Sequence, residues 1–184
     1  MRTYTILLVL TLVLGVVYFI LDRQLFYYGR NDFNLYHLLP LNVVPEQRPD
    51  FEGGFGLKDD YGFTIAAKGN TYKFNGKDIL INEVVNYYFN TDRVIAQVVD
   101  VNNESYYVEL SGNRDGLTKQ DIMAKVWSER DAINLNGFRC VGIKEREKHI
   151  GRLVLPRNFA MFAVIALFIV LIYKTVRLLR KSSK

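Results

Sequence analysis

Two uncharged apolar runs lie near the two ends of this 184-residue chain, and they restrict its fold more than any other feature. The first reads TILLVLTLVLGVVYFIL from Thr5 to Leu21, and the second reads FAMFAVIALFIVLIY from Phe159 to Tyr173. A helix needs about 20 apolar residues to cross roughly 30 Å of hydrocarbon. Flanking residues extend both runs toward that length, so the sequence predicts transmembrane helices over residues 4–22 and 158–178.

Each run has an alternative interpretation. The first could be a cleaved signal peptide, but no small-x-small cleavage site follows Gly15, which favours an uncleaved signal anchor. The second could be the core helix of a soluble domain, yet a core helix seldom ends in a basic tail that lacks acidic residues. We therefore expect a two-pass membrane protein.

The positive charge of the chain lies outside its central segment. The formal net charge is +5, and all 19 acidic residues fall between Asp22 and Glu147. Of the 24 Lys and Arg residues, 18 lie between Asp22 and Arg157, so the segment between the two runs is near neutral. The basic surplus belongs to the tails and does not indicate a groove for nucleic acid.

Basic tails without acidic residues are typical of the cytoplasmic side of a membrane. We therefore expect both termini in the cytoplasm, the central segment on the extracytoplasmic side, and the plasma (inner) membrane as the location. A second basic cluster within residues 144–157 reduces this contrast. The residues expected to set the topology and to contact anionic lipids are Lys174, Arg177, Arg180, Lys181 and Lys184.

Composition divides the chain into seven segments. In order, they are a short cytoplasmic N-terminus (1–4), transmembrane helix 1 as a signal anchor (4–22), an aromatic, Pro- and Gly-rich juxtamembrane segment (23–60), an α+β extracytoplasmic domain (61–143), a charged connector (144–157), transmembrane helix 2 (158–178) and a basic cytoplasmic tail (179–184). Within the juxtamembrane segment, the glycines of Glu52–Gly56 indicate a flexible hinge.

The central domain shows strand patterns separated by turns. Asn75-Gly76 divides two such patterns, which predicts a hairpin. RVIAQVVDV (93–101) is nearly all apolar, so it is expected to be the central strand, covered on both faces. A helix is predicted from Thr118, with one apolar face made of Ile122, Met123, Val126, Trp127 and Ile133. FRCVGI (138–143) then reads as a last strand, which places Cys140 as a small buried residue. The fold class is α+β, with two transmembrane helices flanking a small extracytoplasmic antiparallel β-meander domain packed by one helix.

Small residues recur within both apolar runs. Small side chains let helix backbones approach closely in a membrane. The two spans are therefore expected to pack antiparallel through Thr11, Gly15, Ala160, Ala163 and Ala166.

No constellation of residues indicates catalysis, a metal or a cofactor. His37 and His149 have no ligand-like spacing, and no G-x-S-x-G sequence exists. Asp59 and Asp60 do not fit the spacing of an EF-hand loop. Asn103-Glu104-Ser105 is a glycosylation sequon only if the chain passes through a eukaryotic secretory pathway.

Aromatic residues are the best candidates for contact with a partner. The candidate interface residues are Phe26, Tyr27, Tyr28, Phe33, Tyr36, Tyr106, Tyr107 and Trp127. The favoured function is a non-catalytic, membrane-anchored interaction module, an accessory or assembly subunit of a cell-envelope protein complex. The expected partners are membrane lipids and another membrane or envelope protein. The alternatives are an immunity or inhibitor protein that neutralises a toxin or regulates a membrane enzyme, and a membrane-anchored hydrolase.

Overall fold

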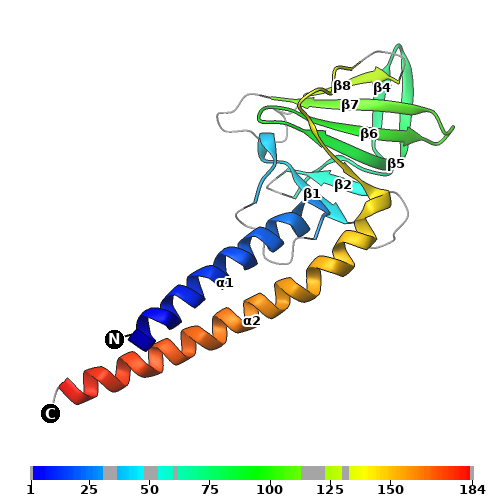
Figure 1. Cartoon of the computed structure of the whole chain (residues 1–184). Helices are drawn as coiled ribbons and strands as arrows, with labels where there is room; N and C mark the ends of the chain where they lie inside the picture. Colours follow the sequence, from blue (N-terminus) through cyan, green and yellow to red (C-terminus); the bar gives the residue numbers. More distant parts are fainter. Residues whose placement is uncertain are drawn as a thin grey trace. The chain divides into compact units, whose positions relative to one another are not determined.

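The structure of the chain is a computed structural model that describes residues 2–30, 37–47, 54–59, 62–112, 123–129 and 133–182. The chain forms two compact units. One consists of its two ends, Met1–Leu25 and Lys148–Lys184, and we call it the helix pair; the other, Phe26–Glu147, we call the β unit (Figure 1). The predicted α+β class, with long apolar helices at both ends flanking an antiparallel β domain, is confirmed.

Two long helices supply the helix pair. Helix α1 spans Arg2–Tyr27 and helix α2 spans Ile143–Ser182. Segment 144–157, which was expected to be a connector, is therefore helical. Each helix contains a stretch long and apolar enough to cross a membrane, Thr3–Tyr27 in α1 and Lys148–Leu178 in α2. A helix suits such a sequence because it satisfies its backbone hydrogen bonds internally.

Two antiparallel sheets form the β unit. The larger sheet has the strand order β4-β5-β6-β7-β8, with β9 paired to β5, and the smaller sheet has the order β1-β2-β3. A short 3-10 helix, η1 (Pro40–Asn42), precedes β1. The strands are β1 (Val44–Gln47), β2 (Phe55–Lys58), β3 (Thr64–Ala66), β4 (Thr71–Phe74), β5 (Lys77–Phe89), β6 (Val94–Asp100), β7 (Ser105–Ser111), β8 (Met123–Ser128) and β9 (Arg139–Gly142).

Short turns with positive backbone angles join neighbouring strands. Asn75 and Gly76 have φ angles of 49° and 79°, and they connect β4 to β5 in a two-residue turn. A type I′ turn needs positive φ at both central residues, which is why Asn-Gly favours it. The predicted hairpin is confirmed. At the β6–β7 turn, Asp100 Oδ1 accepts hydrogen bonds from the backbone N–H groups of Asn102 and Glu104, each at 2.8 Å.

The core of the β unit lies on one face of the larger sheet. Strand β6 lies between β5 and β7, so its predicted central position is confirmed. The expected cover on both faces is incomplete, because Gln97 and Val99 on the other face are half-buried. Val94, Ala96 and Val98 alternate along β6 and belong to the same core cluster as Tyr87 of β5. Phe55 of β2 joins this cluster, and its ring meets that of Tyr87 at 5.2 Å, edge to face. The smaller sheet therefore supplies the cover that the sequence assigned to a helix.

The helix predicted from Thr118 is wrong where the structure describes this region, because Met123–Ser128 form strand β8. Strand β8 pairs with β7 from Tyr106↔Ser128 to Ser111↔Met123. Val126 packs against the core. Trp127 contacts Glu109 instead, because alternate residues of a strand face opposite sides. Residues 113–122 and 130–132 lie outside the described residues.

Gly54 is part of the ordered sheet structure. It forms a parallel bridge with Val84 of β5, and β2 begins at the next residue. Its φ angle is +75°, and a Cβ atom there would lie 2.1 Å from the Val84 carbonyl oxygen. Only glycine fits such an approach. The expected hinge at Glu52–Gly56 is therefore wrong for Gly54–Gly56, and residues 52–53 are among those not described.

Candidate binding face

Polar side-chain contacts join α1 and α2 within the helix pair. Arg157 Nη1 donates a hydrogen bond to Asp22 Oδ1 at 3.1 Å, and these two side chains are only 6% and 2% exposed. The hydroxyl groups of Tyr4 and Thr175 are hydrogen-bonded at 3.0 Å. Since early residues of α1 meet late residues of α2, the helices run antiparallel (Figure 1).

The spacing of these contacts is the same on both helices. Tyr4 and Asp22 are 18 residues apart, and so are Arg157 and Thr175. Eighteen residues make about five helical turns, or about 27 Å along the axis, so both contacts lie on one face of each helix. This distance is close to the thickness of about 30 Å of a bilayer's hydrocarbon core.

The small residues expected to pack the helices together occupy different environments. Ala160 is buried, whereas Thr11, Gly15 and Ala163 are half-buried and Ala166 is exposed. The Thr11 hydroxyl donates to the Leu7 carbonyl oxygen of its own helix at 2.8 Å. No atom lies within 4 Å of where a Cβ at Gly15 would be, so the backbones do not meet closely there. Packing through this set of residues stays a prediction.

The basic residues near the end of α2 are described only in part. Lys174 is half-buried and Arg177 is exposed. Arg180 and Lys181 belong to the helix, but their side chains are not described, and Lys184 lies outside the described residues. Their predicted contacts with lipid headgroups stay a prediction.

The outer face of the larger sheet carries a row of aromatic and amide side chains. Tyr88 of β5, Gln97 of β6 and Tyr107 of β7 lie on adjacent strands, with Gln97 directly opposite Tyr107. Tyr88 donates its hydroxyl hydrogen to Gln97 Oε1 at 3.1 Å, and Asn86 Nδ2 donates to the same oxygen at 2.7 Å. The rings of Tyr88 and Tyr107 are 6.3 Å apart. We call Asn86, Tyr88, Gln97 and Tyr107 the aromatic row.

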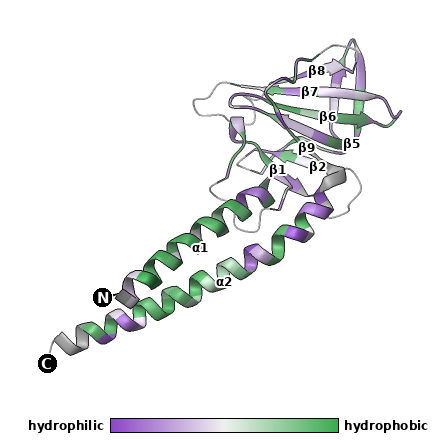
Figure 2. Ribbon diagram, viewed as in Figure 1, coloured by the Kyte–Doolittle hydropathy of each residue, from purple (hydrophilic) through white to green (hydrophobic). Residues whose placement is uncertain are grey.

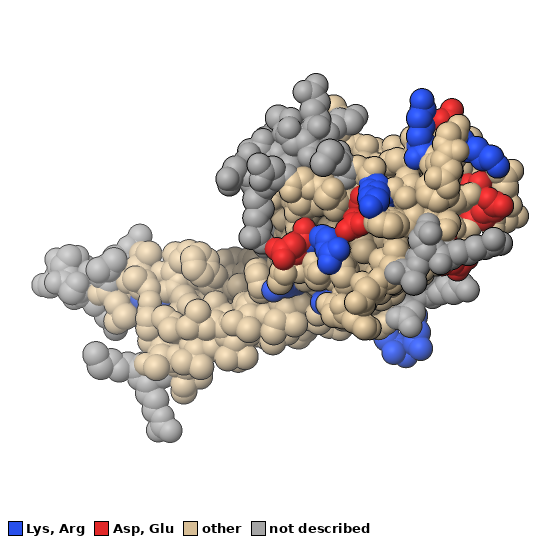
Figure 3. All heavy atoms as spheres, turned by 90° about the horizontal axis from the view of Figure 1, so that it is seen from above, with Lys and Arg blue, Asp and Glu red and all other residues tan. Residues whose placement is uncertain are grey.

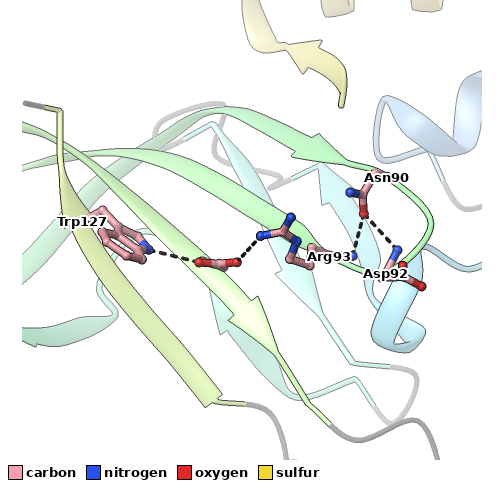
Figure 4. A network of polar contacts seen from close by, with 5 residues as sticks. Asn90, Asp92, Arg93 and Trp127 are labelled. Carbon is pink, nitrogen blue, oxygen red and sulfur yellow. Dashed lines mark hydrogen bonds and ion pairs between the residues drawn. The ribbon is translucent and has the colours of Figure 1, made fainter. Parts of the chain in front are cut away.

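A cavity of about 510 Å³ opens beside this row, at one end of the sheet. Glu109 is one of the residues that line it. One carboxylate oxygen of Glu109 accepts a hydrogen bond from Trp127 Nε1 at 3.1 Å, and the other pairs with Arg93 Nη1 at 3.2 Å (Figure 4). The Arg93 guanidinium also lies 5.5 Å from the centre of the Phe138 ring. The β5–β6 turn, strands β7 and β8 and the segment before β9 thus all contribute to one polar and aromatic cavity.

The turn between β5 and β6 forms part of the cavity wall. Asn90 Oδ1 accepts hydrogen bonds from the backbone N–H groups of Asp92 and Arg93, each at 2.9 Å (Figure 4). These bonds hold the turn, and they place the Asn90 side chain in the wall next to Arg93. Lys125 lies two residues before Trp127 on β8. Its Nζ is 3.7 Å from the centre of the Trp127 ring, which is a cation–π contact.

Burial raises the pKa of the Tyr88 phenol to about 12, mainly by removing it from water. The pKa of Tyr107 is raised for the same first reason. Tyr106 also has a pKa raised to about 12, but there the main cause is its hydrogen bond of 2.6 Å to Glu104. All three phenols are therefore neutral at physiological pH and can donate hydrogen bonds.

The aromatic residues predicted as interface anchors do not form one surface. Phe26 and Tyr27 are buried in the core of the β unit, at 1% and 5% exposure, so their assignment as surface anchors is wrong. Tyr27 stacks on Phe89 at 5.2 Å and lies under the Arg139 guanidinium, which explains its burial. Tyr28, Tyr106, Tyr107 and Trp127 are half-buried, and Phe33 and Tyr36 lie outside the described residues.

The remaining polar candidates have structural contacts. His37 is buried, with its ring 5.5 Å from that of Phe26, and His149 is half-buried on α2. Asp59 Oδ1 accepts a hydrogen bond from the Phe63 N–H at 2.7 Å, which fixes the turn before β3; Asp60 is not described. Among the residues that the structure describes, no group of three His, Cys, Asp or Glu side chains could hold a metal ion.

Cys140 is exposed rather than buried, although the strand predicted around it is present as β9. Val141 is the residue of β9 that turns inward, and it joins the core. Because neighbours on a strand face opposite sides, Cys140 must face outward.

Sequence reasoning missed Asp22, Arg157, Arg93, Glu109 and the role of Tyr88. One signal for Tyr88 was present, since Tyr87 and Tyr88 are adjacent on a strand and only one of them can enter the core. No such local signal links Asp22 to Arg157, which are 135 residues apart.

No family model matches the chain, and no curated protein or solved structure is significantly similar to it. Two features of the chain itself point to a function: the apolar helix pair and the outer face of the larger sheet.

Proposed function

We propose that this chain is a two-pass membrane protein that presents its β unit as a non-catalytic interaction module. The observation that carries the proposal is the outward-facing surface of the helix pair, where large apolar side chains are exposed. Leu155 is 77% exposed, Phe159 72% and Leu12 62%. Figure 2 shows hydrophobic colour along most of α1 and along the middle of α2, with hydrophilic colour near the helix ends. Exposing so many large apolar side chains to water costs free energy, whereas contact with lipid tails does not.

The charge distribution supports the orientation. On the face drawn in Figure 3, acidic and basic side chains gather over the β unit, and few are seen along the helix pair. The tails carry basic residues and no acidic ones, which favours cytoplasmic termini and an extracytoplasmic β unit in the plasma (inner) membrane. The basic end of α2 would then contact anionic headgroups, at about 1 kcal/mol per residue.

We place the contact with a partner on the aromatic row. Tyrosine is enriched in protein interfaces because one ring supplies apolar area and a hydroxyl group with little rotamer entropy to lose. Here the Tyr88 hydroxyl is already oriented by Gln97, and neutral phenols avoid the cost of burying a charge. The occupant that fits a membrane-held β unit is another membrane or envelope protein, for which this chain acts as an accessory or assembly subunit.

Isolation of the full chain from native membranes in a mild detergent tests this function. We expect a second protein at fixed stoichiometry, identified by mass spectrometry. Tyr107→Ala should reduce its recovery, because the substitution removes a ring from the middle of the row. Lys73→Ala is the matched control, since Lys73 is exposed on β4 and is not part of the row. A wild-type chain that purifies alone as a monomer would contradict the proposal.

A further inference from the structure

The cavity beside the aromatic row has the size of a small-ligand site. Its volume is about 510 Å³. Binding sites for small ligands typically measure about 300–1,000 Å³, whereas a protein partner usually covers about 800 Å² of a broad surface. The cavity is therefore better suited to one or two units of a small ligand than to the flat contact of a protein.

The charges inside the cavity compensate each other. Arg93 and Glu109 form an ion pair at 3.2 Å, and Trp127 Nε1 donates to the second carboxylate oxygen. An anionic ligand attracted by Arg93 would be repelled by the Glu109 carboxylate. A cationic ligand attracted by Glu109 would be repelled by the Arg93 guanidinium. The pair therefore favours an uncharged ligand with hydrogen-bonding groups.

Amide side chains supply several hydrogen-bonding groups around the cavity. Asn90, Asn134 and Asn136 all line it. The oxygens of Asn90 and Asn134 accept bonds from backbone N–H groups, from Asp92 and Arg93 in one case and from Asn136 at 3.0 Å in the other. These bonds orient the two amides, so that their NH₂ groups are positioned donors.

Two aromatic rings complete the lining. Trp127 comes from β8 and Phe138 from the segment before β9, so apolar ring surface borders the polar groups. A ligand that matches both needs apolar C–H surfaces as well as groups that donate and accept hydrogen bonds. A pyranose ring has this combination, because its hydroxyl groups both donate and accept while its C–H faces pack on aromatic rings.

We propose that this cavity binds a neutral sugar unit of a glycan. The sugar packs against Trp127 and Phe138, while the asparagine amides, Arg93 and Glu109 hydrogen-bond to its hydroxyl groups. This goes beyond the proposed function, because a protein partner seated on the aromatic row does not require the cavity.

Fluorescence of the full chain tests the site directly, since Trp127 is the only tryptophan in the sequence. The protein is purified in lauryldimethylamine oxide, a detergent without a sugar headgroup. Maltohexaose, cellohexaose and hexa-N-acetylchitohexaose, which are all neutral, are the probes, and each is titrated separately. We expect a saturable change in the emission of Trp127 with at least one of these glycans.

Two asparagine variants localise the binding. Asn136→Ala removes an amide from the cavity wall and should weaken binding about three- to tenfold, the effect of one hydrogen bond. Asn82→Ala removes an exposed amide from β5 outside the cavity and should leave binding unchanged. Equal melting temperatures of the two variants show that both are folded.

Two results would overturn the proposal. They are the absence of a saturable response to all three glycans, and an equal effect of Asn136→Ala and Asn82→Ala on binding. Neither bears on the accessory function, which is tested separately by the Tyr107→Ala isolation.

Discussion

The two units of this chain place polar and apolar side chains in opposite ways. In the β unit, apolar residues such as Phe55 and Val98 are buried, and most charged side chains lie outside. In the helix pair, large apolar residues are exposed, and the ion pair between Asp22 and Arg157 is buried. This opposite distribution is what the proposed two-pass arrangement requires, with the two units in different solvents. The contrast therefore supports a membrane around the helices and water around the sheets.

Matched deletions of a phenylalanine ring give the largest expected contrast between the units. Phe55→Ala should destabilise the β unit by about 3–5 kcal/mol, because it leaves a cavity beside Tyr87. Phe159→Ala should change stability by less than about 0.5 kcal/mol, as for an exposed position. Thermal unfolding of the full chain in detergent, followed by circular dichroism, measures both. Similar losses of stability from the two variants would contradict the opposite placement of apolar side chains in the two units.

Breaking the buried ion pair should have the next largest effect. Asp22→Leu leaves Arg157 without its carboxylate and should destabilise the helix pair by about 3 kcal/mol. This is the lower end of the usual range, because a released arginine can extend toward lipid headgroups. The double variant Asp22→Leu/Arg157→Leu should recover most of the loss, since a buried pair can often be replaced by apolar residues. A double-mutant cycle in the same unfolding assay gives the coupling energy, and purely additive effects would rule out a direct pair.

Alkaline pH should destabilise the β unit before it affects the helix pair. The pKa values of Tyr72 and Tyr88 are raised to about 12, mainly by burial, and burial also raises the pKa of Tyr87 well above its ordinary value. In the unfolded chain these phenols ionise near pH 10. The stability they contribute is complete below about pH 10 and is lost as the pH rises toward 12. Phenolate absorbance and circular dichroism, measured together, should show ionisation coinciding with loss of strand signal; ionisation of all tyrosines at pH 10 with no unfolding would contradict this.

The hydrogen bond between Tyr4 and Thr175 should contribute less than the ion pair. Tyr4→Phe keeps the ring and removes the hydroxyl, so we expect a loss of about 0.6–1 kcal/mol from the helix pair. Tyr18→Phe is the control, because Tyr18 is a half-buried tyrosine of the same helix. If the control lost as much stability as Tyr4→Phe, the hydrogen bond between Tyr4 and Thr175 would not be the cause of the loss.

Gly15→Ala should have the smallest effect of all. An added Cβ meets no atom within 4 Å, and alanine is the better helix former. Cross-linking of α1 to α2 through engineered cysteines should therefore be unchanged. A loss of cross-linking would show that the backbones approach at Gly15, as the sequence alone suggested.

Local patterns in the sequence predicted the parts of this fold that depend on local geometry. The Asn75–Gly76 turn is one case, since its two positive φ angles are a property of these residue types. Strand β8 was missed because Met123, Val126 and Trp127 fit a helical face, and only pairing with β7 decides in favour of a strand. The burial of Phe26 and Tyr27 depends on partners such as Phe89 and Arg139, far away in the sequence. The cavity likewise combines four separate segments, so no local pattern could indicate it.

The native cysteine allows the most direct test of the central claim, that the helix pair crosses a membrane and leaves the β unit outside. Cys140 is the only cysteine in the chain, and it is exposed on β9. A membrane-impermeant maleimide added to intact cells should label Cys140. In a Cys140→Ser background, Lys184→Cys should react only after the membrane is permeabilised. Labelling of Lys184→Cys in intact cells, with Cys140 protected until permeabilisation, would contradict the account.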